Sequence, residues 1–118
     1  MATLIPKPTV IPSAGNKPKI IREFVGQVNS KTSTTSVARM TSPEGWVEPG
    51  QTPEFDEFTL VLRGSVQVEH DGGVLDVAAG QAIVTRAGER IRYSTKDGAE
   101  YVAICLPAFA PDLAKRED

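Results

Sequence analysis

Short apolar runs that end at turn residues constrain the fold of this chain more than any other feature. None of the runs exceeds eight residues, and the turns between them include Asp71-Gly72-Gly73 and Lys96-Asp97-Gly98. Strands at this spacing in a short chain are typical of a sandwich or a small barrel. The predicted strands are Lys19–Val25, Thr34–Thr41, Phe58–Leu62, Ser65–His70, Val74–Ala78, Ala82–Thr85, Ile91–Thr95 and Tyr101–Leu106.

Composition supports an all-β chain of one domain. Val, Ile and Thr, which favour strands, occur 12, 7 and 10 times, against 6 Leu. No stretch of 12 or more residues has apolar residues at helical spacing, and only residues 112–118 could form one short helical turn. The 118 residues suffice for a single core.

Charge and hydropathy exclude two classes of partner. Thirteen Lys and Arg residues against 15 Asp and Glu residues give a net charge of −2, which excludes an electrostatic grip on nucleic acid as the main activity. No apolar run approaches the ~20 residues that span a membrane. Prolines interrupt the first residues, so no secretory signal is visible, and we expect a cytoplasmic protein.

Metal ligands are scarce, since the chain has one cysteine and one histidine. Neither a disulfide nor a multi-histidine metal cage can therefore form within one chain. Cys105 lies in the run Tyr-Val-Ala-Ile-Cys-Leu, which favours a buried apolar role over a reactive thiol.

The residues around Arg63-Gly64 allow two arrangements. A two-residue hairpin at this point would pair Glu57 with His70 and Thr59 with Val68. In a jelly roll, the two strands could instead bend apart into different sheets.

Glycine spacing adds a more specific signal. Gly45 is followed by Gln51, Pro53, Glu57 and Gly64 in the spacing Gly-x5-Gln-x-Pro-x3-Glu-x6-Gly. A second series begins at Gly80 and reads Gly-x5-Arg-x-Gly-x2-Ile-x3-Thr, with Ile91 in its fourth place. This spacing resembles the two motifs of the cupin superfamily over residues 34–109. The resemblance implies a jelly-roll β-barrel or sandwich that holds a small-molecule ligand in its mouth.

The resemblance also implies where a metal would bind, and the residues there differ. Cupins usually hold a metal with two His and one Glu from the first motif and one His from the second. Those places are occupied here by Gln51, Pro53, Glu57 and Ile91, of which only Glu57 is a good ligand. We therefore expect no metal and no other cofactor. The alternative is a nonstandard metal site made of Gln51, Glu54, Glu57 and His70.

Two stretches resemble one branch of the cupins in particular, the EutQ-like proteins of ethanolamine utilisation. They are Phe55–Gly64, followed by Val68–Gly72, and Tyr101–Phe109. The Pro-Ala-aromatic end of the second stretch also resembles small metal-free cupin dehydratases. We expect an extended N-terminal arm at 1–18, a cupin barrel at 19–112 and a solvated C-terminal tail at 113–118. A homodimer is the expected assembly, because cupins commonly pair.

Glu57 is the first candidate for chemistry, because a carboxylate aimed into an apolar barrel has to be paired, neutral or functional. We expect Tyr93 and His70 to assist it catalytically. Each has a plainer alternative: a hydrogen-bonded structural acid, a core tyrosine and an exposed histidine at a strand end. The expected ligand-binding residues are Gln51, Thr59, Ile91 and Trp46.

Three functions compete at this point. The first is a metal-independent enzyme that moves a proton in an elimination, isomerisation or epimerisation. The second is a ligand-binding or accessory module without catalysis, and the third is a metalloprotein with nonstandard ligands. A cavity that contains both Glu57 and Tyr93 would favour the enzyme, whereas a mouth plugged by Phe55, Phe58 and Trp46 would exclude it.

Overall fold

Nine strands and one helical turn make up residues 1–117, the part of the chain that the computed structural model describes. The elements are β1 (Thr9–Ile11), β2 (Ile20–Val25), β3 (Ser36–Ser42), β4 (Trp46–Val47), β5 (Asp56–His70), β6 (Gly73–Ala78), β7 (Ala82–Thr85), β8 (Arg92–Thr95), β9 (Ala99–Leu106) and α1 (Pro111–Ala114). The prediction of an all-β chain is confirmed. Each predicted strand corresponds to an observed strand, or to part of one, within about two residues at either end.

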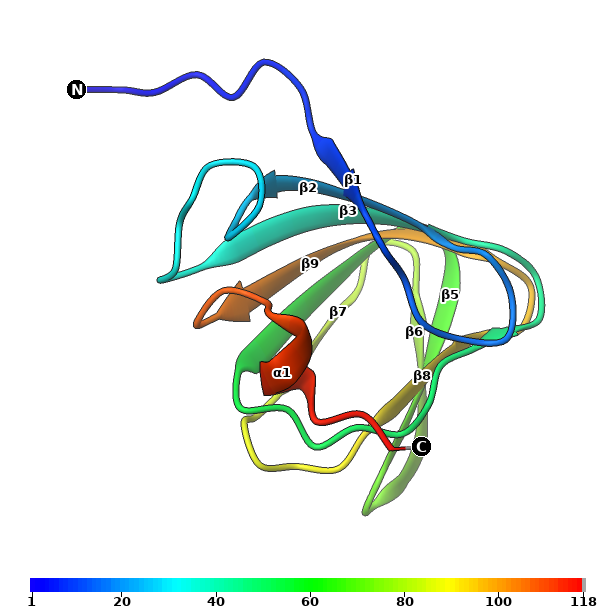
Figure 1. The fold of residues 1–118 in the computed structure, drawn as a ribbon. Helices are drawn as coiled ribbons and strands as arrows, with labels where there is room; N and C mark the ends of the chain where they lie inside the picture. The colour runs from blue at the N-terminus through cyan, green and yellow to red at the C-terminus, as the bar shows by residue number, and fades with distance from the viewer. Residues whose placement is uncertain (118) are drawn as a thin grey trace.

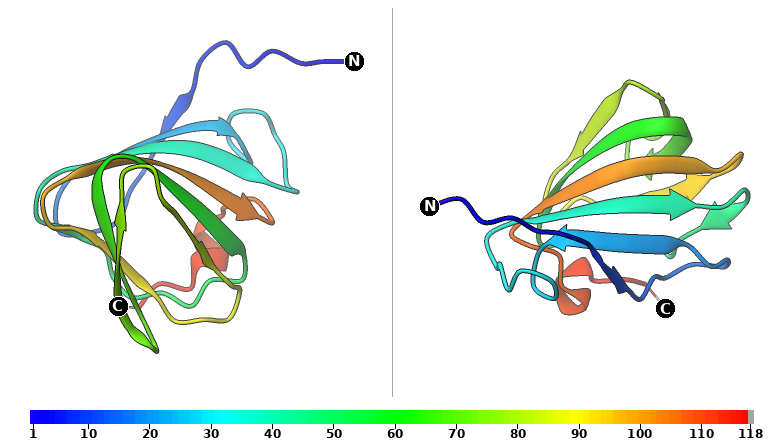
Figure 2. Two further views of the ribbon diagram at one scale, coloured as in Figure 1. Left: turned by 180° about the vertical axis from the view of Figure 1, so that it is seen from behind. Right: turned by 90° about the horizontal axis from the view of Figure 1, so that it is seen from above.

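The strands curl into an open barrel of two layers (Figure 1). Hydrogen bonds connect them in the order β1-β2-β3-β9-β5-β8-β4, and β6 and β7 also pair with β5. All of these pairs are antiparallel. Figure 2 shows the curved sheet from behind and from above, with β1, β2, β3 and β9 side by side. This arrangement confirms the jelly-roll prediction.

Strand β5 belongs to both layers, so of the two arrangements that the residues around Arg63-Gly64 allow, the hairpin is wrong and the bend into different sheets is confirmed. Its first half pairs with β7 and β9, whereas Ser65–His70 pairs with β6 and β8. Gly64 has a φ of 76°, and a Cβ there would collide with the carbonyl oxygen of Gly98. Glycine thus lets one continuous strand bend between the layers. Consequently Glu57 lies opposite Cys105 and Thr85, not opposite His70.

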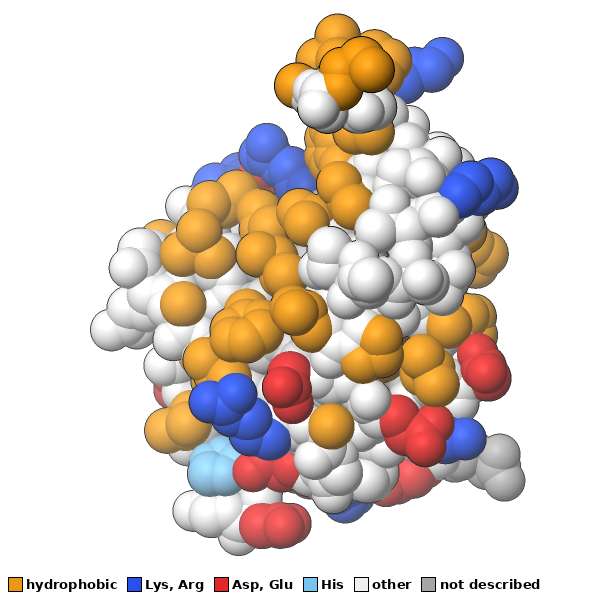
Figure 3. All heavy atoms as spheres, turned by 90° about the vertical axis from the view of Figure 1, so that its left-hand side faces the viewer, with side chains coloured by type: hydrophobic (Ala, Val, Ile, Leu, Met, Phe, Trp, Pro, Cys, Tyr) orange, Lys and Arg blue, Asp and Glu red, His pale blue; other side chains and the backbone are white. Residues whose placement is uncertain are grey.

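The N-terminal residues only partly fit the expected arm. Residues 1–8 form no strand and extend from the body of the molecule (Figure 1). Strand β1 then pairs antiparallel with β2, where Thr9 lies opposite Glu23. Figure 3 shows exposed hydrophobic side chains on this extension and on the face below it. The arm thus lies partly on its own barrel.

Two clusters of buried side chains form the core. The larger cluster fills the barrel around Trp46, Ile91 and Tyr93. A smaller one joins Phe55 and Cys105 to Ala114 of α1, and the rings of Phe55 and Phe109 meet edge to face at 6.0 Å between centroids. The second cluster packs the C-terminal residues against the barrel.

The structure tests the membrane prediction for helices. Within residues 1–117, no helix is long and apolar enough to cross a bilayer. The cytoplasmic location remains a prediction.

Candidate functional site

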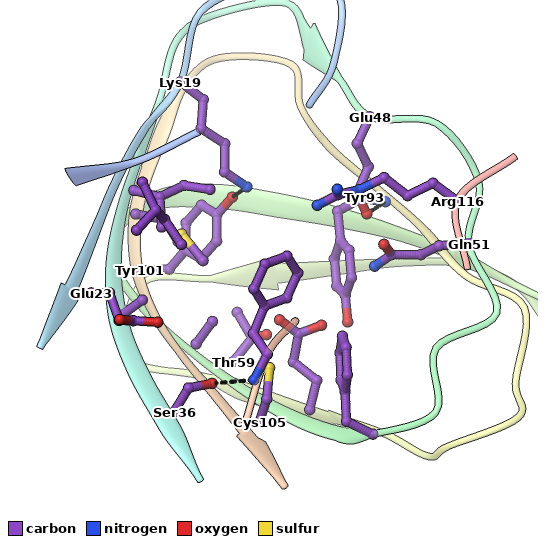
Figure 4. A pocket seen from close by; sticks show the side chains of 18 residues that line it. Lys19, Glu23, Ser36, Glu48, Gln51, Thr59, Tyr93, Tyr101, Cys105 and Arg116 are labelled. Carbon is purple, nitrogen blue, oxygen red and sulfur yellow. Dashed lines mark hydrogen bonds between the residues drawn. The ribbon is translucent and has the colours of Figure 1, made fainter. Parts of the chain in front are cut away.

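A cavity of about 50 Å³ lies inside the barrel (Figure 4). Its walls come from β2, β3, β5, β8 and β9, and from residues 48–55 and 109–116. Figure 4 shows Lys19 and Tyr101 on one side of it, and Glu48, Gln51, Tyr93 and Arg116 on the other. Apolar side chains complete the lining, so several polar groups converge in a largely apolar space.

Glu57 projects into this cavity from β5. Its strand neighbours are Thr85 of β7 and Cys105 of β9. Loss of water raises the pKa of the Glu57 carboxyl, and the Tyr93 hydroxyl, which hydrogen-bonds to it, opposes that rise. A carboxyl group with a raised pKa holds a proton more readily than an exposed one and can exchange it with a bound molecule.

Tyr93 brings a hydroxyl group to the same place. The hydroxyl lies 3.0 Å from the Thr85 Oγ1, and burial and the nearby Glu57 carboxylate raise the pKa of Tyr93 well above its usual value. The phenol therefore stays protonated and can donate a hydrogen bond. Glu57 and Tyr93 thus place a carboxyl group and a hydrogen-bond donor side by side in the cavity.

Cys105 is the other neighbour of Glu57. The thiol is buried, and desolvation raises its pKa far above the usual value. It therefore stays a thiol at neutral pH, which agrees with the expectation of an unreactive buried residue.

Glu48 is a second buried carboxyl group in the cavity. It follows β4, and its Oε1 accepts a hydrogen bond from the Tyr93 N–H at 3.2 Å. Only 8% of the residue is exposed, and burial raises its pKa to about 7, with Lys19 and Arg116 opposing the rise and Glu57 adding to it. Glu48 therefore changes charge near neutral pH.

Replacing Glu48 by glutamine should stabilise the protein at pH 8. Between the unfolded pKa of 4.5 and the folded pKa of about 7, the folded state holds a proton that the unfolded state has released. The free energy of unfolding of the native chain therefore falls as the pH rises through this window. Glu48→Gln removes this loss, worth about 1–3 kcal/mol above pH 7, and preserves the acceptor for the Tyr93 N–H.

Urea unfolding at pH 4.5 and pH 8 measures the effect. The variant and the native chain should differ little at pH 4.5. Glu44→Gln, an exposed carboxyl group on the same segment, is the matched control and should leave the pH dependence unchanged. An unaltered pH dependence in Glu48→Gln would show that Glu48 is ionised at no cost in the folded state.

Lys19 brings a positive charge to the mouth of the cavity. Its Nζ donates to the Tyr101 hydroxyl at 3.1 Å and lies 4.1 Å from the centre of the Trp46 ring. The Tyr101 hydroxyl in turn lies 2.9 Å from the Ser42 Oγ. An aromatic face and a hydroxyl thus hold the ammonium group in place without a carboxylate.

Arg116 brings a second positive charge, and the C-terminal segment (residues 111–117) positions it. The segment bonds along residues 50–54: Glu54 N donates to Leu113 O at 2.8 Å, and Glu117 N donates to Gly50 O at 2.8 Å. Arg90 donates two hydrogen bonds to the Glu117 carboxylate, from Nε to Oε2 at 2.7 Å and from Nη2 to Oε1 at 3.0 Å. Residues 113–117 are thus docked, against the expectation of a solvated tail. Asp118 lies outside the described residues.

The predicted ligand-binding residues divide into two groups. Gln51 and Thr59 line the cavity, as do Glu57 and Tyr93. Ile91 is in backbone contact with Gln51, with hydrogen bonds of 2.8 and 2.9 Å, but its side chain belongs to the core. Trp46 is fully buried in the same core and donates to Ala14 O at 3.0 Å, so it reaches the cavity only through Lys19.

His70 lies away from the cavity. It ends β5 next to the turn into β6, where its Nδ1 accepts a hydrogen bond from Gly72 N at 3.2 Å. Figure 3 shows the histidine, in pale blue, at the molecular surface. The plainer alternative of a histidine at a strand end fits this position, although the residue is half-buried and not fully exposed, and the hypothesised contact with Glu57 is wrong.

The residues of the alternative metal site also lie apart. Glu54 is exposed and lies 3.5 Å from Lys115, and His70 is in a different layer from Glu57. Within residues 1–117, no three His, Cys, Asp or Glu side chains are placed so that they could hold a metal ion. The donor set of the usual cupin cage does not fit here either, since Ile91 offers no ligand atom.

Sequence reasoning missed Glu48, Lys19 and Arg116. Glu48 shares strand parity with Trp46, and an inward Trp46 would have placed it inside. Lys19 and Arg116 come from the two ends of the chain, and no local pattern connects them.

Comparison with known families decides what kind of domain surrounds this cavity. The family model described as an AraC-binding-like domain matches residues 26–117. The chain belongs to this family of cupins. One curated relative, the Myxococcus xanthus protein named endoribonuclease YbeY, is 41% identical over 101 residues, which cover 84% of this cupin. This cupin spans about a third (34%) of the length of that relative.

Solved structures share the fold of this cupin. A Salmonella typhimurium ethanolamine utilisation protein Q is 21% identical, with a TM-score of 0.67 over 77% of this cupin and 71% of that chain. A variant of Streptomyces PAC13 solved with uridine is 16% identical, with a TM-score of 0.75 over 98% of this cupin and 88% of that chain. The predicted resemblance to EutQ-like cupins is confirmed at the level of the fold.

Proposed function

We propose that this cupin binds a small polar molecule in its cavity and moves a proton on it, with Glu57 as the acid–base group. The observation that carries the proposal is the placement of the Glu57 carboxyl beside the Tyr93 hydroxyl in a cavity from which bulk water is largely excluded. Of the three aromatic residues that could plug the mouth, Phe58 does not line the cavity and Trp46 is packed in the core. Phe55 does line it, as a wall residue that belongs to the smaller core cluster.

The reaction that fits these groups is proton transfer next to a carbonyl group. Glu57 as carboxylate takes a proton from carbon, so that the C–H bond breaks and a carboxyl O–H bond forms. The electron pair moves to the carbonyl oxygen, and the Tyr93 hydroxyl donates a hydrogen bond to the negative charge that develops there. Return of a proton from Glu57 to carbon completes an exchange or an isomerisation without an oxidant or reductant.

Deuterium exchange tests this proposal without a known substrate. The protein is incubated in D₂O with small ketones, aldehydes, oxo acids and their amides, and proton NMR follows the C–H signals next to the carbonyl group. We expect exchange in at least one compound above the rate without protein. If every compound exchanges only at the background rate, the proton-transfer proposal is wrong.

Binding without catalysis is the second candidate, and the size of the cavity favours it. About 50 Å³ is far below the roughly 300 Å³ of common ligand pockets, so a nucleoside such as the uridine solved with PAC13 would not fit. A compound that binds at Glu57 but does not exchange its protons would identify a sensing or accessory module.

The outer face of the sheet bears on the predicted homodimer, which we retain as a proposal. Leu60, Leu62 and Val84 are 44–46% exposed there on β5 and β7. Burial of such side chains against a second copy would stabilise a pair. Light scattering should give the mass of two chains, and the mass of one chain would exclude the dimer.

A further inference from the structure

The cations around the cavity differ from many others in the molecule because they have no ion-pair partner among the described residues. Lys19 and Arg116 each lower the pKa of two carboxyl groups that line the cavity, the buried Glu48 and the half-buried Glu57. Neither cation comes within ion-pair distance of a carboxylate in residues 1–117, whereas six other cations do so: Arg39, Arg63, Arg86, Arg90, Arg92 and Lys115. Lys19 and Arg116 are not the only cations without a carboxylate partner in residues 1–117, but they are the ones that line the cavity and that a ligand inside it could reach.

Within residues 1–117, Arg116 also has a hydrogen-bond donor without an acceptor. Its Nε is buried and has no hydrogen-bond partner in the described part of the chain, although the Phe109 ring lies under the guanidinium group at 5.5 Å. Buried donors in native proteins are almost always satisfied by protein or solvent. The C-terminal segment nevertheless holds Arg116 in place through the Arg90–Glu117 pair and the backbone bonds to residues 50–54.

We propose that Lys19 and Arg116 bind the carboxylate group of a small monocarboxylic acid, which the cavity takes as its ligand. Arginine offers paired N–H donors that match the two oxygens of a carboxylate, and lysine adds a point charge. In Figure 4 the two side chains enter from opposite sides, as a clamp on one group requires. The carboxylate of Glu23, which also lines the cavity, accepts hydrogen bonds from the backbone N–H groups of Val28 and Asn29 and forms no ion pair with either cation.

The volume limits the size of this ligand. A cavity of about 50 Å³ has room for about four water molecules, which corresponds to an acid of about four to six non-hydrogen atoms. This inference names the ligand of the proposed enzyme, and it rests on the proposed function wherever a reaction of that ligand is concerned. The binding of a carboxylate does not depend on catalysis.

Titration of the ¹⁵N-labelled full chain with a matched series of three-carbon compounds tests the proposal. The probes are propanoate, propanamide and propylammonium, with inorganic phosphate as a second anion. We expect propanoate to bind with a Kd between about 0.1 and 10 mM, as an efficient ligand of this size would. Propanamide, propylammonium and phosphate should bind at least ten times more weakly. Equal binding of the amide, or tighter binding of the ammonium compound or of phosphate, would overturn the proposal.

Variants locate the site. Arg116→Gln and Lys19→Gln should each weaken propanoate binding by about tenfold or more, and Arg116→Lys should recover part of the loss. Arg63→Gln removes the same charge from an exposed position outside the cavity and should bind like the native chain. The amide spectrum of each variant reports whether it is folded. Native affinity in folded Arg116→Gln and Lys19→Gln would show that these cations do not hold the ligand.

The pH dependence gives a second readout. Glu48 faces Lys19, Glu57, Tyr93 and Arg116, and its ionisation adds negative charge beside the ligand. Propanoate should therefore bind more tightly at pH 6 than at pH 8.5, and Glu48→Gln should reduce this difference. Stronger binding at pH 8.5 than at pH 6 would contradict an anion site beside Glu48.

The two proposals can fail separately. If propanoate binds through Arg116 and no compound exchanges protons, the carboxylate site stands and the proton-transfer enzyme does not. If only neutral ketones exchange their protons and propanoate does not bind, the enzyme stands and the carboxylate site does not.

Discussion

Replacing Glu57 by glutamine should reduce deuterium exchange by a factor of about 10² to 10⁴, the usual contribution of a positioned acid–base group. The amide is nearly the same size as the carboxyl group but cannot take a proton from carbon. Rates of exchange for the best compound of the D₂O panel, measured by NMR for the native chain and the variant, give the factor. A variant that still exchanges at the native rate would show that another group is the base.

Two further variants distinguish the chemistry of Glu57 from its packing. Glu44→Gln removes an exposed carboxyl group and should exchange at the native rate. Tyr93→Phe removes the hydroxyl group that lowers the pKa of Glu57, so that pKa should rise further. The base is active when ionised, and the rise of the exchange rate with pH should therefore shift to higher pH in Tyr93→Phe.

Truncating Trp46 to alanine should destabilise the protein by about 3–5 kcal/mol, which is typical for a large buried aromatic side chain. Trp46 is fully buried in the larger core cluster, and its Nε1 donates to Ala14 O, which ties the N-terminal residues to the barrel. The variant loses the packing, the hydrogen bond and the face on which Lys19 rests. Urea unfolding, followed by circular dichroism, measures the change.

A pair of milder variants makes this prediction specific. Trp46→Phe retains a ring and should lose only about 1–2 kcal/mol, mainly from the hydrogen bond and the smaller volume. Val47→Ala, at the exposed neighbouring position, should change the free energy of unfolding by less than about 0.5 kcal/mol. A loss below 1 kcal/mol in Trp46→Ala would mean that the ring is not part of the core.

The strands could be predicted because their patterns are local. Ala82–Thr85 was predicted with the observed bounds of β7, and the other predicted strands differ by about two residues at most at their ends. The exception is Arg63-Gly64, since a glycine with a φ of 76° permits either a reversal or a bend. Whether the chain reverses or bends at this glycine depends on β9, which is distant in sequence and pairs antiparallel with the first half of β5.

The site could be predicted only where strand parity and motif spacing apply. They placed Gln51, Thr59 and Tyr93 near Glu57, and the structure places all of them on the cavity. They misplaced Ile91, which pairs with Gln51 through its backbone while its side chain faces the core. Lys19 and Arg116 could not be found in this way, because 96 residues separate them and only the folded barrel brings both of them to the cavity.

The docking of the C-terminal segment connects the cavity to whatever is attached after it. Figure 1 shows the C-terminal segment, up to residue 117, beside the barrel, whereas the first residues of the chain extend well away from it. A purification tag or a second domain joined directly after Asp118 would load the residues that carry Arg116 and the Arg90–Glu117 pair. The same addition before Met1 would begin at a distance from the site. In a longer protein, a following domain would therefore be attached next to the residues that position Arg116.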